Sequence, residues 1–314
     1  MAWYIIGAIL GLLVVFGLIW THCERGKLLH PSTRRLFREG GWKRFLNLKS
    51  LHGYIYLRWT TRYIAMCVQV IAPLFKTRAV NWLAARYHGK VITHELAREI
   101  ILVNQEVPLV DLEQIIPYPS ARNLVLNGPP DIVVTECPCR SFRDNPCQPT
   151  QVCMIIGQPF VNFKLEHSPE KSRLINREEA LMLLEEEHQR GHVHSAWFRD
   201  VTLDRFIAIC NCCKCCCGGI EGMMKYGSPM MVASGYVSQV DESSCTSCGL
   251  CVGICPFEAI SIIDEHAVIA WSKCLGCGIC TTQCPNKALS LIRDEKKGIP
   301  LDVRWLSGQK TTKI

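Results

Sequence analysis

The sequence CTSCGLCVGICP at residues 245–256 recurs as CLGCGICTTQCP at residues 274–285. Each cysteine and the closing proline of the second copy lie 29 residues after their counterparts in the first. The match continues beyond the prolines, since Ala259 corresponds to Ala288 and apolar residues follow both. The two stretches are therefore an internal duplication of the pattern C-x2-C-x2-C-x3-C-P.

Thiols at this spacing are typical ligands of iron–sulfur clusters. Three cysteines three residues apart can surround one cubane cluster, and the proline turns the chain away after the fourth. Residues 236–295 therefore resemble a bacterial 2×[4Fe-4S] ferredoxin domain, in which the fourth cysteine of each run serves the other cluster. The resemblance implies two [4Fe-4S] clusters, one on Cys245, Cys248, Cys251 and Cys284 and the other on Cys255, Cys274, Cys277 and Cys280. Two zinc ribbons are the alternative, but ribbons need neither the third cysteine nor the proline.

Short strands are expected on both sides of these cysteines. The alternating segments 236–240, 261–263 and 267–270 have the composition of strands. Phe257 and Trp271 are the residues we expect to exclude water from the clusters.

Ten further cysteines lie in the middle of the chain, which is a large share of the 20 in 314 residues. In a reducing cytoplasm such groups are usually metal ligands or redox-active thiols rather than disulfides. An additional iron–sulfur cluster, a zinc site and a thiol or assembly role all remain open. Adjacent cysteines point in different directions, so we expect one centre to draw two ligands from each group. The first group is Cys137, Cys139, Cys147 and Cys153, and the second is Cys210, Cys212, Cys213, Cys215, Cys216 and Cys217.

This part of the chain also resembles cysteine-rich 4Fe-4S proteins in which a CPCR segment and a CNCC-x-CCC run precede a ferredoxin domain. The matching residues are 137–140 and 210–217. The resemblance implies metal binding and names no substrate.

Polar residues between the two groups have simpler interpretations. Asn176 begins a capping box for a helix over 177–190, whose glutamates we expect to face solvent. We expect His188, His192 and His194 to be exposed or hydrogen-bonded rather than metal ligands. Arg140 and Arg143 either stabilise the negative charge of a cluster or pair with nearby acids, and the sequence leaves that choice open.

The N-terminal end predicts a membrane anchor. Residues 2–20 carry no charge and span about 28 Å as a helix, and Trp3, Tyr4 and Trp20 lie at the two ends where aromatic rings prefer the membrane interface. A cleaved signal peptide is the alternative, but no basic stretch precedes the run and no small-residue cleavage site follows it. We therefore predict a single-pass transmembrane helix.

Positive charge is confined to the residues beside this helix. Residues 1–90 hold 14 Lys and Arg against two acidic residues, whereas residues 91–314 hold 21 against 26, within a net charge of +7. This distribution indicates an anionic lipid surface rather than nucleic acid as partner, and it places the bulk of the chain on the cytoplasmic side. Residues 54–75 are expected to lie in the membrane interface, with a second span as the alternative. The basic residues that follow the helix are Arg25, Lys27, Arg34, Arg35, Arg38, Lys43, Arg44 and Lys49.

These signals together predict an α+β protein. We expect a transmembrane anchor (1–21), a basic amphipathic juxtamembrane segment (22–90), a mixed α/β cysteine-rich domain with a metal site (91–235), a ferredoxin-like dicluster domain (236–295) and a tail (296–314).

Three functions fit this organisation. The first is an electron carrier that exchanges electrons with a redox partner protein. The second is a redox enzyme subunit whose active centre is at the middle cysteines, and the third is an iron–sulfur assembly or activating factor. The sequence contains no G-x-G-x-x-G, P-loop or haem-attachment motif, so we expect no organic cofactor and assign no catalytic residue.

Overall fold

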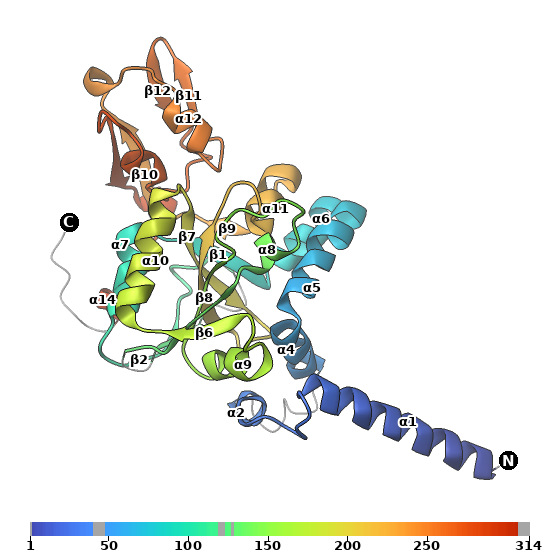
Figure 1. The fold of residues 1–314 in the computed structure, drawn as a ribbon. Coiled ribbons are helices and arrows are strands. Elements are labelled where there is room, and N and C mark those ends of the chain that lie inside the picture. Colours follow the sequence, from blue (N-terminus) through green and yellow to red (C-terminus); the bar gives the residue numbers. More distant parts are fainter. Residues whose placement is uncertain (1, 40–47, 119–122, 127–128, 307–314) are drawn as a thin grey trace.

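The fold consists of a central sheet with helices on both faces, a cysteine-rich lobe at one end and a projecting N-terminal helix (Figure 1). A computed structural model describes residues 2–39, 48–118, 123–126 and 129–306. The mixture of helices and mainly antiparallel strands agrees with the predicted α+β class.

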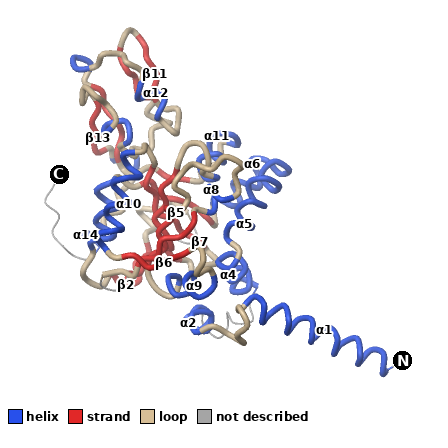
Figure 2. The backbone as a smooth tube through the Cα atoms, viewed as in Figure 1, coloured by secondary structure: helices blue, strands red, loops and turns tan. Residues whose placement is uncertain are grey.

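Nine strands of the described residues form the central sheet, which Figure 2 shows in the middle of the molecule. Its main path runs β6-β4-β5-β8-β7-β1-β9, with antiparallel pairs except between β1 and β9. Strands β2 and β3 pair with each other, and β3 also joins β8. The strands are β1 (Tyr87–Val91), β2 (Val107–Asp111), β3 (Asn123–Leu126), β4 (Ile132–Glu136), β5 (Gln151–Ile156), β6 (Ser172–Ile175), β7 (Val193–Arg199), β8 (Arg205–Cys212) and β9 (Met231–Val232).

Both faces of the sheet are buried, because alternate residues of each strand enter different cores. Ile132 and Val134 of β4 pack in the core beneath α7 (His94–Leu102), α10 (Arg177–Gln189) and α14 (Val303–Leu306). Val133 packs on the opposite side. That side is covered by α2 (Pro31–Glu39), α4 (Leu48–Arg58), α5 (Thr60–Met66) and α9 (Phe160–His167). The π-helical η1 (Cys67–Ile71), α6 (Ala72–Ala84), α8 (Pro138–Ser141) and α11 (Gly218–Tyr226) complete the helices around the sheet.

The lobe formed by the duplicated segment has two small antiparallel sheets, β10 with β13 and β11 with β12. Its elements are β10 (Tyr236–Val240), η2 (Glu242–Ser244), α12 (Leu250–Ile254), β11 (Ile260–Ile263), β12 (His266–Ile269), α13 (Ile279–Thr282), β13 (Leu289–Arg293) and η3 (Glu295–Lys297). The strands expected around the cysteines are therefore confirmed. The tail returns to the main body, where Leu301 and Val303 are buried in the core beside α7.

The expected helix over 177–190 is present as α10. The side-chain oxygen of Asn176 accepts the N–H of Glu179 at 2.8 Å, and Gly191 follows the helix at a positive φ of 80°. The expectation that its glutamates all face solvent is wrong, because Glu187 is fully buried. Ala180, Leu184 and Glu187 recur at helical spacing, so Glu187 faces the core.

Helix α1 (Ala2–Cys23) projects from the body (Figure 1). Its described side chains are almost all exposed. Among the described residues it is the one helix long and apolar enough to cross a membrane, a property that a signal sequence would share. The side chain of Trp3 lies outside the described residues. Trp20 stacks on Tyr54 with ring centroids 5.5 Å apart, so it contacts the protein itself.

Residues 54–75 differ from the expected interfacial helix. They are divided among α4, α5, η1 and α6. Tyr54, Tyr56 and Leu57 are buried against the sheet, because their large side chains complete the core beneath α4. Apolar side chains remain exposed farther along, at Met66, Val70, Leu74, Phe75 and Trp82.

Several basic residues after α1 pair with acids of the body. Arg25 contacts Glu170 at 3.1 Å and Lys49 contacts Asp204 at 2.8 Å. Lys27, Arg34 and Arg38 are exposed, and Lys43 and Arg44 lie outside the described residues.

The packing of α4 gives a direct test of this arrangement. A Cβ on Gly53 would lie 2.1 Å from the carbonyl oxygen of Val201, a backbone atom that cannot move alone. We predict that Gly53→Ala lowers the free energy of unfolding by about 1–3 kcal/mol, measured by urea titration in detergent. Gly17→Ala in α1 is the control, since nothing lies within 4 Å of its added methyl group. If α4 lay in lipid, both substitutions would be equally harmless.

Candidate iron–sulfur and thiolate sites

The eight cysteines of the lobe line two separate cavities. Cys245, Cys248, Cys251 and Cys284 line the first, and Cys255, Cys274, Cys277 and Cys280 line the second. The fourth cysteine of each run thus lies with the first three of the other run. The backbone amides of Ala259 and Ala288 lie at equivalent positions in the two copies. Each donates its N–H to the sulfur of the fourth cysteine of its own run at 3.3 Å.

The two cavities differ in exposure. Cys248 of the first cavity is exposed, whereas all four cysteines of the second are buried. Phe257 is buried beside the second cavity, as expected. The expectation for Trp271 is wrong, since 44% of it is exposed; its indole N–H donates to Asp294 and Lys297 lies over its ring.

Six of the middle cysteines form a closed ring of hydrogen-bonding thiols, which we call the six-thiol ring. Each sulfur neighbours two others, and the Sγ atoms of Cys153 and Cys210 are 3.9 Å apart. Hydrogen bonds from Cys210 and Cys217 lower the pKa of the Cys212 thiol below its ordinary value. In order, the members are Cys137, Cys153, Cys210, Cys212, Cys217 and Cys139.

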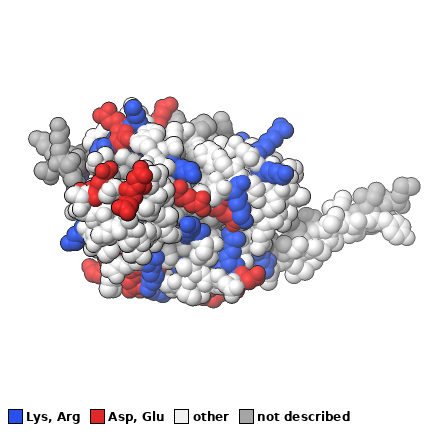
Figure 3. Space-filling view, turned by 90° about the horizontal axis from the view of Figure 1, so that it is seen from above, with Lys and Arg blue, Asp and Glu red and all other residues white. Residues whose placement is uncertain are grey.

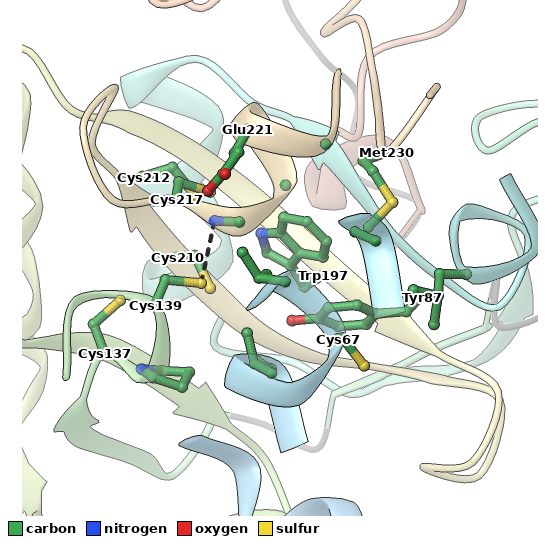
Figure 4. Close-up of a pocket in the computed structure, with 18 of the residues that line it drawn as sticks. Cys67, Tyr87, Cys137, Cys139, Trp197, Cys210, Cys212, Cys217, Glu221 and Met230 are labelled. Carbon is green, nitrogen blue, oxygen red and sulfur yellow. Dashed lines mark hydrogen bonds between the residues drawn. The ribbon is translucent and has the colours of Figure 1, made fainter. Parts of the chain in front are cut away.

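The six-thiol ring lies at one side of a largely apolar cavity of about 80 Å³ (Figure 4). Tyr87, Trp197 and Met230 line it as well, and the N–H of Gly218 points at Cys139 Sγ from 3.5 Å. Cys67 lines this cavity too, although nothing in its sequence surroundings distinguished it. The ring therefore combines thiols with a space that apolar side chains enclose.

The other four middle cysteines form a second group, which we call the four-thiol group. The Sγ atoms of Cys147, Cys213 and Cys215 all lie within 4.8 Å of one another. Cys216 completes the group, with its Sγ 3.3 Å from that of Cys215 and 3.4 Å from the N–H of Cys147.

Local structure explains this partition. Residues two apart on a strand face the same side, so Cys210 and Cys212 of β8 both enter the ring while Asn211 faces away. After the strand ends, the chain turns and Cys213, Cys215 and Cys216 join Cys147. The six-thiol ring and the four-thiol group each combine cysteines from both groups of the sequence, as expected. The ring takes three from each group, and the four-thiol group takes one from the first and three from the second, rather than two from each.

A buried charged network lies between the two thiol groups. Arg140 is 1% exposed and donates to Glu187 at 2.8 Å and to the carbonyl of Asn211 at 3.0 Å. His192 joins it, with Nδ1 2.7 Å from Glu187 and Nε2 3.5 Å from Cys147 Sγ. Burial raises the pKa of Glu187, but hydrogen bonds from His192 and Arg140 outweigh this effect and hold that pKa below its ordinary value.

Arg143 makes a similar pair with Glu221 at 2.5 Å and donates to the carbonyl of Cys216. Both arginines therefore pair with acids while lying beside thiols. Of the two states expected for His188, His192 and His194, the hydrogen-bonded one is confirmed, since all three are buried and each has a hydrogen-bond partner.

The donor sets fit different metal centres. A tetrahedral zinc site with Zn–S bonds of about 2.3 Å has sulfurs about 3.8 Å apart, close to the spacing of the four-thiol group. A cubane cluster separates its cysteine sulfurs more widely, and the described lobe cysteines form no group as compact as the four-thiol group. The six-thiol ring offers more sulfurs than the four irons of one cubane require.

Comparison with known proteins agrees with the iron–sulfur assignment of the lobe. The sequence model of the 4Fe-4S binding domain matches residues 238–261 and 267–290. These two tandem matches indicate [4Fe-4S] clusters and fit two of them. No curated protein that was compared with the chain matches it.

The buried network yields a stability prediction. Glu187→Gln removes the charge that compensates Arg140 in the interior, so we expect a loss of about 3–5 kcal/mol in unfolding free energy by urea titration. Glu186→Gln is the matched control, because Glu186 is adjacent in α10 and its side chain is 58% exposed in a pair with Arg190. Its loss should stay below about 1 kcal/mol. Equal losses of unfolding free energy in the two variants would show that the buried network contributes no more to stability than a surface ion pair.

Proposed function

We propose that this protein is a membrane-anchored electron carrier that relays electrons through two [4Fe-4S] clusters in its C-terminal lobe to or from a redox partner protein. The two cavities carry this proposal, since each gathers four cysteines from both copies of a matched 4Fe-4S binding domain. The set Cys245, Cys248, Cys251 and Cys284 would hold one cluster, and the set Cys255, Cys274, Cys277 and Cys280 the other. Each cluster, when bound, supplies one-electron redox chemistry.

The lobe's own residues indicate where a partner can approach. The first cavity contains the exposed Cys248, while the four cysteines of the second cavity are buried and Ile279, which lines that cavity, faces Gly191 of the body. Seven acidic and three basic residues occur within 236–295, and all three basic residues are exposed. A partner with a basic surface around its own redox centre would complement this lobe.

A further centre in the middle domain extends the relay. The six-thiol ring is the better candidate for an additional iron–sulfur cluster, because its thiols exceed the needs of a mononuclear ion. The four-thiol group fits zinc better, since its sulfurs are compact. Arg140 lies between the two groups, where its charge would stabilise anionic thiolate centres.

A redox enzyme subunit is the second candidate, favoured by one observation. The six-thiol ring borders an apolar cavity, with Trp197 and Tyr87 on its walls, that a small apolar ligand could enter. Reduction of such a ligand by the full protein, abolished in a ring variant, would favour the enzyme over the carrier.

The membrane attachment rests on helix α1. Its C-terminal end is built into the fold, because the carboxylate of Glu24 is buried and accepts hydrogen bonds from Tyr54 at 2.6 Å and the N–H of His30 at 2.6 Å. This integration favours a retained anchor over a cleaved signal. In Figure 3, α1 extends as an uncharged arm from a body with patches of both signs. The exposed Lys27, Arg34 and Arg38 would face anionic lipid on the cytoplasmic side.

Iron content tests the relay. The lobe accounts for about eight iron atoms per chain, and we expect the anaerobically purified protein to hold more than this. Cys139→Ser should return the count to about eight and remove one EPR signal while those of the lobe remain. Cys67→Ser is the matched control, since Cys67 lines the same cavity outside the ring. A wild-type count of eight that Cys139→Ser leaves unchanged would contradict a cluster in the ring.

Deletion of part of α1 tests the anchor. Removing residues 2–16 leaves Trp20 on Tyr54, so the truncated protein should keep its iron but leave the membrane fraction, as followed by sedimentation after lysis. Retention of the truncated protein at the membrane would assign the attachment to the exposed apolar residues of η1 and α6.

A further inference from the structure

Three histidines from different elements meet beside the cluster lobe. His94 begins α7, His188 lies near the end of α10, and His194 lies in β7. One ring nitrogen of each lies within 4.8 Å of one on both others, and the ring centroids are 4.7–5.4 Å apart. His188 and His194 are buried, and His94 is half-buried.

An oxygen atom faces the outer nitrogen of each ring. Asn211 Oδ1 lies 2.7 Å from His194 Nδ1, Glu185 Oε2 lies 3.1 Å from His94 Nε2, and Thr282 Oγ1 lies 2.7 Å from His188 Nε2. Histidines that bind metal almost always donate their other ring N–H to such an oxygen, which fixes the tautomer and the ring orientation.

The hydrogen bonds fix where two of the ring protons lie. Asn211 donates its side-chain N–H to the carbonyl of Val152 at 2.9 Å, so its oxygen faces His194 and accepts from Nδ1. The carboxylate of Glu185 only accepts, so His94 carries its proton on Nε2.

The inner nitrogens are consequently left without a donor. His94 Nδ1 and His194 Nε2 face each other at 3.3 Å, and in neutral rings both are lone pairs. His188 Nδ1 is buried and has no hydrogen-bond partner among the described residues. Burial lowers the pKa of His188 to about 4 and of His194 to about 3, which keeps these rings neutral near pH 7. Facing lone pairs repel each other unless a cation lies between them.

We propose that His94, His188 and His194 bind one divalent transition-metal ion of the zinc class, separate from every thiol site. Two nitrogens that share a tetrahedral ion at about 2.05 Å lie about 3.3 Å apart, which matches the separation of His94 Nδ1 and His194 Nε2. Three histidine ligands with the fourth position left for water is a known arrangement of catalytic zinc.

The site would join the lobe to the body. Thr282 belongs to α13, between Cys280 and Cys284, and Gln283 donates to the carbonyl of Gln189 at 2.7 Å next to His188. On the other side, Asn211 lies between two cysteines of the six-thiol ring. An ion at this position would stiffen the contact between the lobe and the body.

Zinc uptake by the complete, cluster-containing protein tests the proposal. After incubation with Zn²⁺ and removal of excess metal, we expect the zinc X-ray absorption to contain nitrogen ligands at about 2.0–2.1 Å, distinct from sulfur at about 2.3 Å. His94→Ala should lose one zinc per chain and that nitrogen shell, with iron and sulfide content unchanged. His266→Ala in β12 is the matched control and should keep both.

Zinc bound through sulfur alone in the wild-type protein would overturn the proposal, as would full retention of zinc by His94→Ala. Failure of the wild-type protein to take up zinc would also overturn it. In that case, a proton lies between His94 Nδ1 and His194 Nε2, on a charged His94 ring that is paired with Glu185. If His94→Ala loses iron through misfolding, the nitrogen shell of the wild-type spectrum decides alone.

Discussion

Strand β8 presents alternate residues to opposite faces of the sheet, and the middle of the molecule depends on that alternation. Cys210 and Cys212 point into the six-thiol ring, whereas the side chain of Asn211 between them faces His194. The position of Asn211 opposite His194 in the β7–β8 pair brings these two side chains together, and the backbone carbonyl of Asn211 accepts from Arg140. A shift of one residue in this register would exchange the two faces and separate both groups at once.

The remaining elements bring partners to these two faces. On one side, β5 and α8 supply Cys153 and Cys139, and the residues directly before α8 and α11 supply Cys137 and Cys217. On the other side, α7 and α10 supply two histidines and Glu187. The lobe then docks through α13 on the end of α10, which places the buried cavity of the lobe nearer the body than the exposed one. The arrangement is consistent with a relay that enters at the exposed cavity and continues inward.

The lobe could be predicted almost entirely from the sequence, because its cysteines repeat within a few residues and local spacing determines their geometry. The middle domain could not, since residues far apart in the chain combine there: Cys147 joins Cys213 across 66 positions, and His94 joins His194 across 100. The burial of Glu187 was not predicted because Glu187 lies in a run of glutamates, although its helical spacing from Ala180 and Leu184 indicated that it faces the core. The sequence of residues 54–75 did not distinguish an interfacial helix from packed helices, because apolar side chains suit lipid and a protein core equally. Tyr54 and Leu57 pack in the core.

Anomalous diffraction at the iron absorption edge, from crystals grown without oxygen, would show whether the two lobe cavities hold iron–sulfur clusters on cysteines exchanged between the two copies. We expect one iron peak between Cys245, Cys248, Cys251 and Cys284 and a second between Cys255, Cys274, Cys277 and Cys280. Zinc in these cavities, or iron held by the four cysteines of a single run, would overturn this assignment.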